Sequence, residues 1–447
     1  MWAKIVDTGK SCVEFLIGNL RKLPYEKKFI ENLLRWLPYL IGSILTAVIV
    51  VSYSKLFDYS SSLSHYIKDN FPWLFFIITP VGLLAGWLIV HFLAPGAGGS
   101  GIPQLMAAVN AQRDPKRTST GFLVGGRVLF AKIVGSLIAL LGGGVIGREG
   151  PTIQISGSVY YVTHKFLPKD WPKMDRERML IAGGAAGLAA AFNTPLGGIV
   201  FAIEELSRSN LNAIKSTLLY AVIFSGMTVQ WILGPYLYLG YPHLDVGGFS
   251  MIGYVILFSA VAGIAGAANG KLIFWLVSFV KKIKKISIRI LYILGSGLVV
   301  ATLIYFNENS AFGPGKDVMN DILFDKSTEG INIFLFISRF FATIISYATG
   351  VAGGIFAPSL SSGSILGKLM MDLFNLDPQN KVLILVAMIG FLTGVTRTPF
   401  TSSILVLEMT DSHSAIFLFI LAGLISSVTA RIIDKKPLYR KLEMGFL

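Results

Sequence analysis

The sequence predicts an all-α integral membrane protein, and three observations carry that prediction. The chain has 447 residues, of which 53% are apolar and only 14% are charged. A soluble domain carries about 25% charged residues, so too few are present here to cover a soluble surface. The mean hydropathy is +0.65. Apolar runs recur along the chain, and about 20 apolar residues are enough for one membrane-spanning helix.

The apolar runs differ in length, which predicts broken and re-entrant helices besides complete spans. In chain order they are Leu37–Ser54, Trp73–Ala94, Phe122–Leu141, Met179–Ala191, Thr217–Leu233, Met251–Val280, Ile290–Phe306, Ile331–Thr349, Val382–Thr393 and Ala415–Thr429. Several are too short to cross a bilayer, whereas Met251–Val280 is longer than one crossing needs. Short runs interrupted by Gly and Pro are typical of transporters, which place helix ends near the middle of the membrane.

The charge distribution predicts how the chain is oriented in the membrane. The net charge is +14, and the basic residues flank the apolar runs, so we attribute them to membrane orientation and expect no nucleic-acid partner. The N-terminal segment and residues 113–127, 281–289 and 431–441 are basic, whereas residues 235–250 contain no Lys or Arg. Basic loops stay on the cytoplasmic side, so both termini are expected there. Residues 1–36 resemble an amphipathic cytoplasmic segment and not a cleaved signal peptide.

An internal repeat divides the chain into two halves. Residues 193–205 contain NTPL followed by IEE, and residues 397–409 contain RTPF followed by LEM. In the same order, GREGPT at 147–152 pairs with GIFAPS at 354–359. The repeat predicts membrane halves at 37–234 and 250–440, with 1–36 before them and 441–447 as a short cytoplasmic tail. Duplicated transporter folds bind their substrate where the halves meet.

Three motifs with Gly and Pro lie at the mouths of apolar runs: GSGIP at 99–103, GREGP at 147–151 and GIFAP at 354–358. Pro fits the first turn of a helix, and Gly lets the backbone approach a ligand closely. A helix start presents free N–H groups and the positive end of the helix dipole. Converging starts would bind an anion through partial charges, without a full charge that retains it. One such motif alone can equally be a helix kink.

These motifs, in this order, resemble the signatures of the CLC family of chloride channels and chloride/proton antiporters. Residues 193–205 and the terminal Pro437-Leu438-Tyr439 are similar to that family too, so the resemblance extends from about Leu37 to Tyr439. It implies a CLC-type inverted repeat and a homodimer with one pore per subunit. It also implies a prokaryotic inner (plasma) membrane protein without the cytoplasmic regulatory domains of many eukaryotic members, and without a cofactor, metal or ATP.

The resemblance implies specific chloride-binding residues. Ser100 and Tyr439 would offer their hydroxyls to a central chloride, and the amides of Ile355 and Phe356 would complete that site. The amides of Arg148, Glu149 and Gly150 would line an outer site. The remaining motif residues are Gly99, Gly101, Ile102, Pro103, Gly147, Pro151, Gly354, Ala357 and Pro358. Without the family, Ser100 could be a helix cap and Tyr439 an aromatic residue at the membrane interface.

Two carboxylates are the candidates for proton chemistry. A carboxylate beside helix starts can occupy an anion position itself, and an ionisable residue inside an apolar run is functional by default. We therefore expect Glu149 to be the anion gate and a proton carrier, the alternative being a capping pair with Arg148. The resemblance implies that Glu205 is an internal proton relay, the alternative being a helix-end acid. Glu204 and Glu408, which align in the repeat, are interpreted as structural helix-end acids.

The sequence thus favours a chloride/proton antiporter, with an uncoupled CLC-type chloride channel as the alternative. An enzyme is disfavoured because no nucleophile and base have a suitable spacing, and the five His and single Cys12 form no metal motif. A cation transporter is disfavoured because helix N-termini repel cations. Gln104 follows GSGIP where some relatives have acidic residues, which leaves the tightness of coupling open.

Overall fold

A computed structural model describes residues 27–112, 119–168, 171–207, 216–244, 251–307, 311–325, 330–377 and 379–446. Within these ranges the chain is helical, and the only β-type contacts are two isolated bridges. The predicted all-α fold is therefore confirmed. Most of the predicted N-terminal segment, including Cys12, lies outside the described residues, and residues 27–36 are part of the first described helix.

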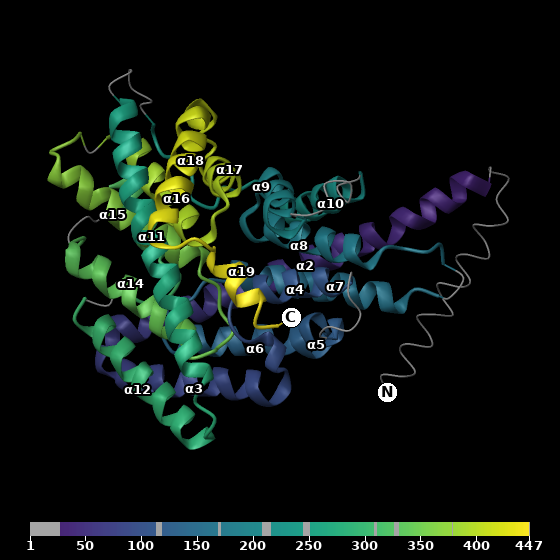
Figure 1. Cartoon of the computed structure of the whole chain (residues 1–447), viewed down its shortest axis with the longest axis horizontal. Coiled ribbons are helices and arrows are strands. Elements are labelled where there is room, and N and C mark those ends of the chain that lie inside the picture. Colours follow the sequence, from purple (N-terminus) through teal and green to yellow (C-terminus); the bar gives the residue numbers. More distant parts are fainter. Residues whose placement is uncertain are drawn as a thin grey trace.

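The described helices divide into two series along the chain (Figure 1). The first series is α2 (Lys27–Asn70), α3 (Phe75–Leu93), α4 (Ile102–Ala111), α5 (Thr120–Val124), α6 (Gly126–Leu141), α7 (Glu149–Phe166), α8 (Arg176–Phe192), α9 (Pro195–Phe201) and α10 (Ser216–Leu233). The second is α11 (Met251–Lys281), α12 (Ile286–Tyr305), α13 (Lys316–Phe324), α14 (Ile333–Ala348), α15 (Phe356–Leu373), α16 (Lys381–Thr396), α17 (Pro399–Thr410), α18 (Ile416–Ile433) and α19 (Leu438–Glu443). Short 3₁₀ turns are η1 (Pro72–Leu74), η2 (Pro95–Ala97) and η5 (His413–Ala415), and η3 (Ala202–Leu206) is a π-helical turn that continues α9.

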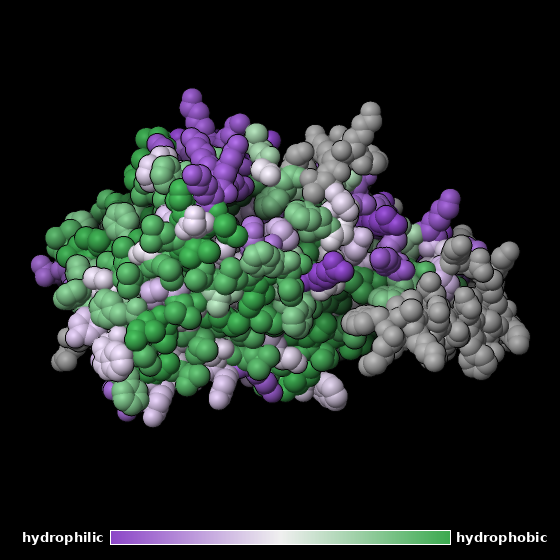
Figure 2. All heavy atoms as spheres, turned by 90° about the horizontal axis from the view of Figure 1, so that it is seen from below, coloured by the Kyte–Doolittle hydropathy of each residue, from purple (hydrophilic) through white to green (hydrophobic). Residues whose placement is uncertain are grey.

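The helices have the unequal lengths that the sequence predicts. Six described segments are long and apolar enough to cross a membrane: Leu33–Asn70, Pro72–Leu93, Thr120–Leu141, Met251–Lys281, Ile286–Tyr305 and His413–Ile433. Three shorter apolar helices are Thr217–Leu233, Ile333–Ala348 and Lys381–Thr396. Apolar residues cover most of the face in Figure 2, and hydrophilic ones gather along its upper edge. The apolar part of this face is the surface that the hydrocarbon core of a bilayer would cover.

The deepest part of the core surrounds α16, in which all residues are buried. Its surface is apolar on nearly every side, which suits a helix enclosed by others, and α16 packs against α11, α15 and α18. Glycines bring α11 and α16 into backbone contact, since a Cβ atom on Gly394 would lie 2.9 Å from the Ala267 nitrogen. Small residues at helix contacts are the usual packing device in membranes.

Two carboxylates tie the halves of the chain together. Glu408 accepts hydrogen bonds from the N–H groups of Leu196 (3.1 Å) and Gly197 (2.7 Å) at the start of α9. Glu204 accepts hydrogen bonds from the N–H (2.8 Å) and hydroxyl (2.7 Å) of Thr401 in the first turn of α17. Each acid thus satisfies the helix start of the opposite half, where free donors need a partner. Both are structural, as expected, but they cap the other half's helix instead of ending their own.

Candidate functional site

Backbone hydrogen bonds hold the loops of the three motifs together. The Gly99 N–H donates to the Val351 carbonyl (2.8 Å), and the Gly353 N–H donates to the Gly99 carbonyl (3.0 Å). Gly147 and Gly354 exchange two hydrogen bonds of 2.8 and 2.7 Å. These contacts join GSGIP to GIFAP and GIFAP to GREGP. Segments more than 200 residues apart in the sequence therefore meet at one place.

A helix begins at each motif, as predicted. The first helical hydrogen bonds of α4, α7 and α15 are donated by Leu105, Thr152 and Ser359. The N–H groups before these residues have no helical acceptor, and in each motif Pro lies in the first turn. Three positive helix ends are thus available to the motif region.

Glycine is required where two of the motifs touch. A Cβ atom on Gly150 would lie 2.8 Å from the Ser100 carbonyl oxygen and 3.2 Å from the Cα of Gly354, and it would also collide with the Ser100 hydroxyl. A Cβ atom on Gly354 would lie 2.9 Å from the Gly150 nitrogen. Any larger residue would push the starts of α7 and α15 apart. These glycines therefore allow two motif loops to touch, whereas close approach of the backbone to a ligand stays a prediction.

Ser100 and Tyr439 bring two buried hydroxyls to this region. Both residues are fully buried, and their side chains are neighbours. The Tyr439 ring stacks on Phe356, with 6.2 Å between ring centroids. Neither hydroxyl has another partner among the described residues, so both can donate to an added ligand. An anion satisfies such donors.

Both alternative interpretations of these hydroxyl residues are wrong. Gly101 is the cap residue of α4, with a φ of 102°, and no side chain caps this helix. Ser100 therefore has no capping role, and its backbone N–H donates to the Tyr347 phenol at 3.2 Å. Tyr439 is 0% exposed, so it is not an aromatic residue of the membrane interface.

Glu149 lies between two helix starts. It is 0% exposed and is the first residue of α7, and its carboxylate accepts a long hydrogen bond of 3.4 Å from the Ala357 N–H in α15. A Cβ atom on Gly147 would collide with the same carboxylate oxygen. Arg148 instead pairs with Asp58 at 2.7 Å, so the alternative of a capping pair between Arg148 and Glu149 is wrong. The carboxylate thus occupies a position suited to an anion.

Glu205 lies in the π-helical turn η3 and is 2% exposed. Such turns often occur at functional sites. The Tyr439 phenol interacts electrostatically with both Glu205 and Glu149, so it is near each carboxylate. Acidic residues are rarely buried this deeply unless they are paired.

A cavity that we call the vestibule leads to Glu149 and has a volume of about 290 Å³. Its walls are Phe57, Asp58, Ser61, Ser62, His65, Arg148, Glu149, Tyr238, Pro314, Lys316, Asp317 and Asn320. His65 lies 3.0 Å from Asp317, and the Lys316 ammonium lies 4.6 Å from the centre of the Tyr238 ring. With the Arg148–Asp58 pair, each basic side chain that lines the vestibule has a neighbour of this kind.

Sequence reasoning missed the residues that support the motif loops. Lys132 is fully buried and donates to the Gly99 carbonyl at 2.8 Å. The Gln104 amide donates to the Gly98 carbonyl, and the Gln154 amide donates to the Gly96 carbonyl at 2.9 Å. The signal for Lys132 was present, since it is a single charge inside the apolar run Phe122–Leu141. In the described part of the chain, no group of three or more metal-ligating side chains is present.

Comparison with known proteins gives matches over most of the chain. Residues 81–431 match the family model described as voltage gated chloride channel. The H(+)/Cl(-) exchange transporter ClcA of Vibrio cholerae serotype O1 (strain M66-2) is 31% identical over 438 residues, covering 94% of this chain and 90% of that protein.

Two solved structures share the fold. A slow cyanobacterial Cl⁻/H⁺ antiporter superimposes with a TM-score of 0.76 at 23% identity, covering 92% of this chain and 97% of that one. A CLC-type fluoride/proton antiporter superimposes with a TM-score of 0.77 at 17% identity, covering 93% and 99%. These similarities show that the fold is of the CLC type.

Proposed function

The chain belongs to the voltage gated chloride channel family, and from this premise we propose that it exchanges chloride for protons across a membrane. The observation that carries the proposal is the position of Glu149. Its buried carboxylate lies at the start of α7 and accepts from the start of α15, where an anion would be stabilised by the same N–H groups.

The exchange follows from competition for one position. The ionised Glu149 side chain occupies the anion position and closes it. When the carboxylate takes a proton it loses its attraction for the helix starts, and chloride replaces it. Chloride next meets the hydroxyls of Ser100 and Tyr439 and the amides of Ile355 and Phe356. Partial charges hold it weakly enough for release.

Glu205 supplies protons to Glu149 from the cytoplasmic side. Its burial and its electrostatic interaction with Tyr439 support this role, because a proton relay must be both ionisable and near the anion path. An uncoupled channel would not need an ionisable group here. No metal, nucleotide or other cofactor takes part in this mechanism.

The proposal includes a location and an assembly. Basic segments on the two terminal sides favour cytoplasmic termini. The similarity to the Vibrio cholerae exchanger supports a prokaryotic inner membrane. The helices α9, α10, α17 and α18 expose large apolar side chains, among them Trp231, Phe400 and Phe417. This surface supports a homodimer in which each subunit keeps its own pore. Cross-linking in native membranes tests the dimer.

Purified protein in liposomes tests the exchange. A chloride gradient is imposed while the reversal potential and the external pH are recorded together. We expect chloride movement to drive uphill proton movement in the opposite direction. A reversal potential at the chloride equilibrium value with constant pH would identify a channel instead. With K⁺ as the only permeant ion, no current is expected, since the positive helix ends repel cations.

A further inference from the structure

A second hollow, which we call the basic hollow, lies beside the corner between α18 and α19. It is lined by Glu204, Arg397, Ser427, Arg431, Lys435, Pro437 and Arg440, and its volume is about 580 Å³. Four of these residues are cations and one is an acid. The transport mechanism uses none of the four cations.

Three of the four cations have no ion-pair partner. Arg431, Lys435 and Arg440 are exposed, and within the described ranges no carboxylate lies within ion-pair distance of them. The one acid of the hollow, Glu204, is engaged by the first turn of α17. The neighbouring Asp434 pairs with Lys441. The hollow therefore has a net positive charge that no carboxylate in the described part of the chain balances through an ion pair.

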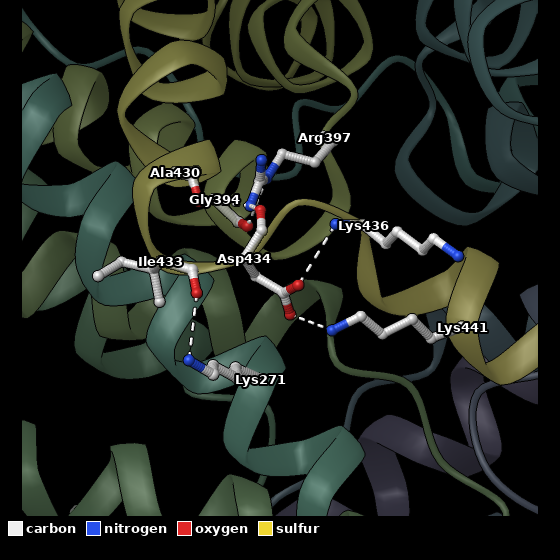
Figure 3. Close-up of polar contacts among 8 residues, drawn as sticks. All are labelled: Lys271, Gly394, Arg397, Ala430, Ile433, Asp434, Lys436 and Lys441. Atoms are coloured by element: carbon white, nitrogen blue, oxygen red, sulfur yellow. Dashed lines mark hydrogen bonds and ion pairs between the residues drawn. The ribbon is translucent and has the colours of Figure 1, made fainter.

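The walls of the hollow are firmly held (Figure 3). The Arg397 guanidinium donates to the carbonyls of Ala430 (2.6 Å) and Asp434 (2.7 Å), which joins the end of α16 to the end of α18. Lys271 donates to the Ile433 carbonyl at 3.2 Å. These contacts satisfy the carbonyl end of α18, which would otherwise attract the cations of the hollow. The three unpaired cations thus surround a preformed space.

We propose that the basic hollow binds a phosphate group, supplied by an anionic lipid headgroup or by a free phosphate compound. Phosphate is multiply charged and accepts several hydrogen bonds, which matches arginines and a lysine around one space. Val428 and Ile432, on the last turns of α18, are 65% and 77% exposed, so the hollow adjoins apolar surface where a membrane span ends. Basic clusters at this level attract anionic headgroups.

Bound phosphate would also strengthen the corner that carries Tyr439. Arg440 follows Tyr439 directly, and Lys435 lies on the other side of the turn into α19. A ligand that contacts both residues joins the end of α18 to the start of α19. The expected effect is higher thermal stability of the loaded protein, because a ligand of the folded state stabilises it.

The test uses the full chain in a neutral detergent and follows its thermal unfolding. The probes are pyrophosphate and a short-chain phosphatidylglycerol, with short-chain phosphatidylcholine and sodium gluconate of equal ionic strength as references. We expect pyrophosphate, phosphatidylglycerol or both to raise the melting temperature. In Arg431→Gln/Arg440→Gln, the apparent affinity should fall at least about tenfold, because charge-assisted contacts are lost. Lys435→Gln is a second, milder variant.

Lys436→Gln is the matched control. Lys436 is exposed on the same corner and carries the same charge, but it does not line the hollow. The affinity of the Lys436→Gln variant for either probe should stay within about twofold of the affinity of the unmodified chain. A response to the lipid alone assigns a headgroup, and a response to pyrophosphate alone assigns a free phosphate compound. The proposal is overturned if neither probe exceeds its reference, or if K436Q weakens binding as much as R431Q/R440Q. The readout is independent of transport, so failure here is distinct from failure of the proposed exchange.

Discussion

The vestibule and the basic hollow are both lined by cations, but they differ in how these charges are balanced. In the vestibule Arg148 pairs with Asp58, and Lys316 lies over the Tyr238 ring. In the basic hollow Arg431, Lys435 and Arg440 have no carboxylate partner among the described residues. The vestibule also leads to helix starts, whereas the hollow lies beside a helix end whose carbonyls are already engaged.

This difference in charge balance matches the two tasks: the vestibule lets an anion pass, whereas the basic hollow retains one. A monovalent anion that must leave again is best held by partial charges, with full charges neutralised nearby. A multiply charged group that is meant to stay is best held by unbalanced charges. One protein thus handles anions in two ways. Substitutions in the vestibule can show whether the pairing of its cations is required for transport.

The largest effect is expected where the vestibule ends, at Glu149. The variant Glu149→Gln cannot ionise, so proton transport should fall at least about a hundredfold while chloride flux continues. Parallel chloride and pH recordings in liposomes measure both. Coupled proton uptake in this variant would remove Glu149 from the mechanism.

A smaller effect on proton flux, specific to one of two adjacent acids, is expected at Glu205 and Glu204. Glu205→Gln should reduce proton flux at least about tenfold and leave chloride flux within about twofold, because the relay is lost but the pore is intact. The matched variant Glu204→Gln should retain coupling and lose about 1 kcal/mol of stability, since it weakens the cap of α17. Equal loss of coupling in both variants would contradict the separate roles.

Unbalancing the vestibule should slow transport. In Asp58→Asn the Arg148 guanidinium loses its carboxylate and becomes a stronger anion trap. We expect tighter apparent chloride binding and a turnover about three- to tenfold lower at low salt, with the effect weakening as salt screens the charge. Chloride titrations of the flux rate measure this. Unchanged kinetics would show that the pairing of Arg148 does not limit anion release.

The smallest effect concerns stability and pH at the rim of the vestibule. The hydrogen bond from His65 lowers the pKa of Asp317 below its usual 3.8. The ionised carboxylate therefore stabilises the fold above that value, and the contribution is lost as the pH falls through the lowered pKa. Asp317→Asn should melt slightly earlier at pH 6, and the difference should shrink as the pH falls below 3.8. A difference that persists in acid would contradict the assignment.

The parts of the fold that sequence predicted are those with local causes. Pro in the first turn marks the beginnings of α4, α7 and α15, which could therefore be predicted from three short motifs. The apolar run Val382–Thr393 predicted the position of α16, which spans Lys381–Thr396, but its complete burial depends on its neighbours in the fold. The meeting of Ser100 with Tyr439 has no local signal, and only the family resemblance indicated it.

The missed features depend on which distant residues become neighbours. The repeat aligned Glu204 with Glu408, but nothing in either half reveals that each acid crosses to the other half. Arg148 stands next to Glu149 in sequence, yet it pairs with Asp58, which α2 supplies. For a charged side chain in a buried environment, the available partner is decided by tertiary packing.

Glu204 and Glu408 each cap a helix of the opposite half, and this has a consequence for the time course of synthesis. The start of α9 needs Glu408, which the ribosome adds 211 residues after Gly197. At about 5–20 residues per second, the first half waits about 10 to 40 s for this partner. During that interval the N–H groups at the start of α9 lack their final acceptor. Newly made chains should therefore be most sensitive to proteolysis and to membrane quality control until Glu408 has emerged. A chain that ends just before Glu408 should be as vulnerable as a half-length one.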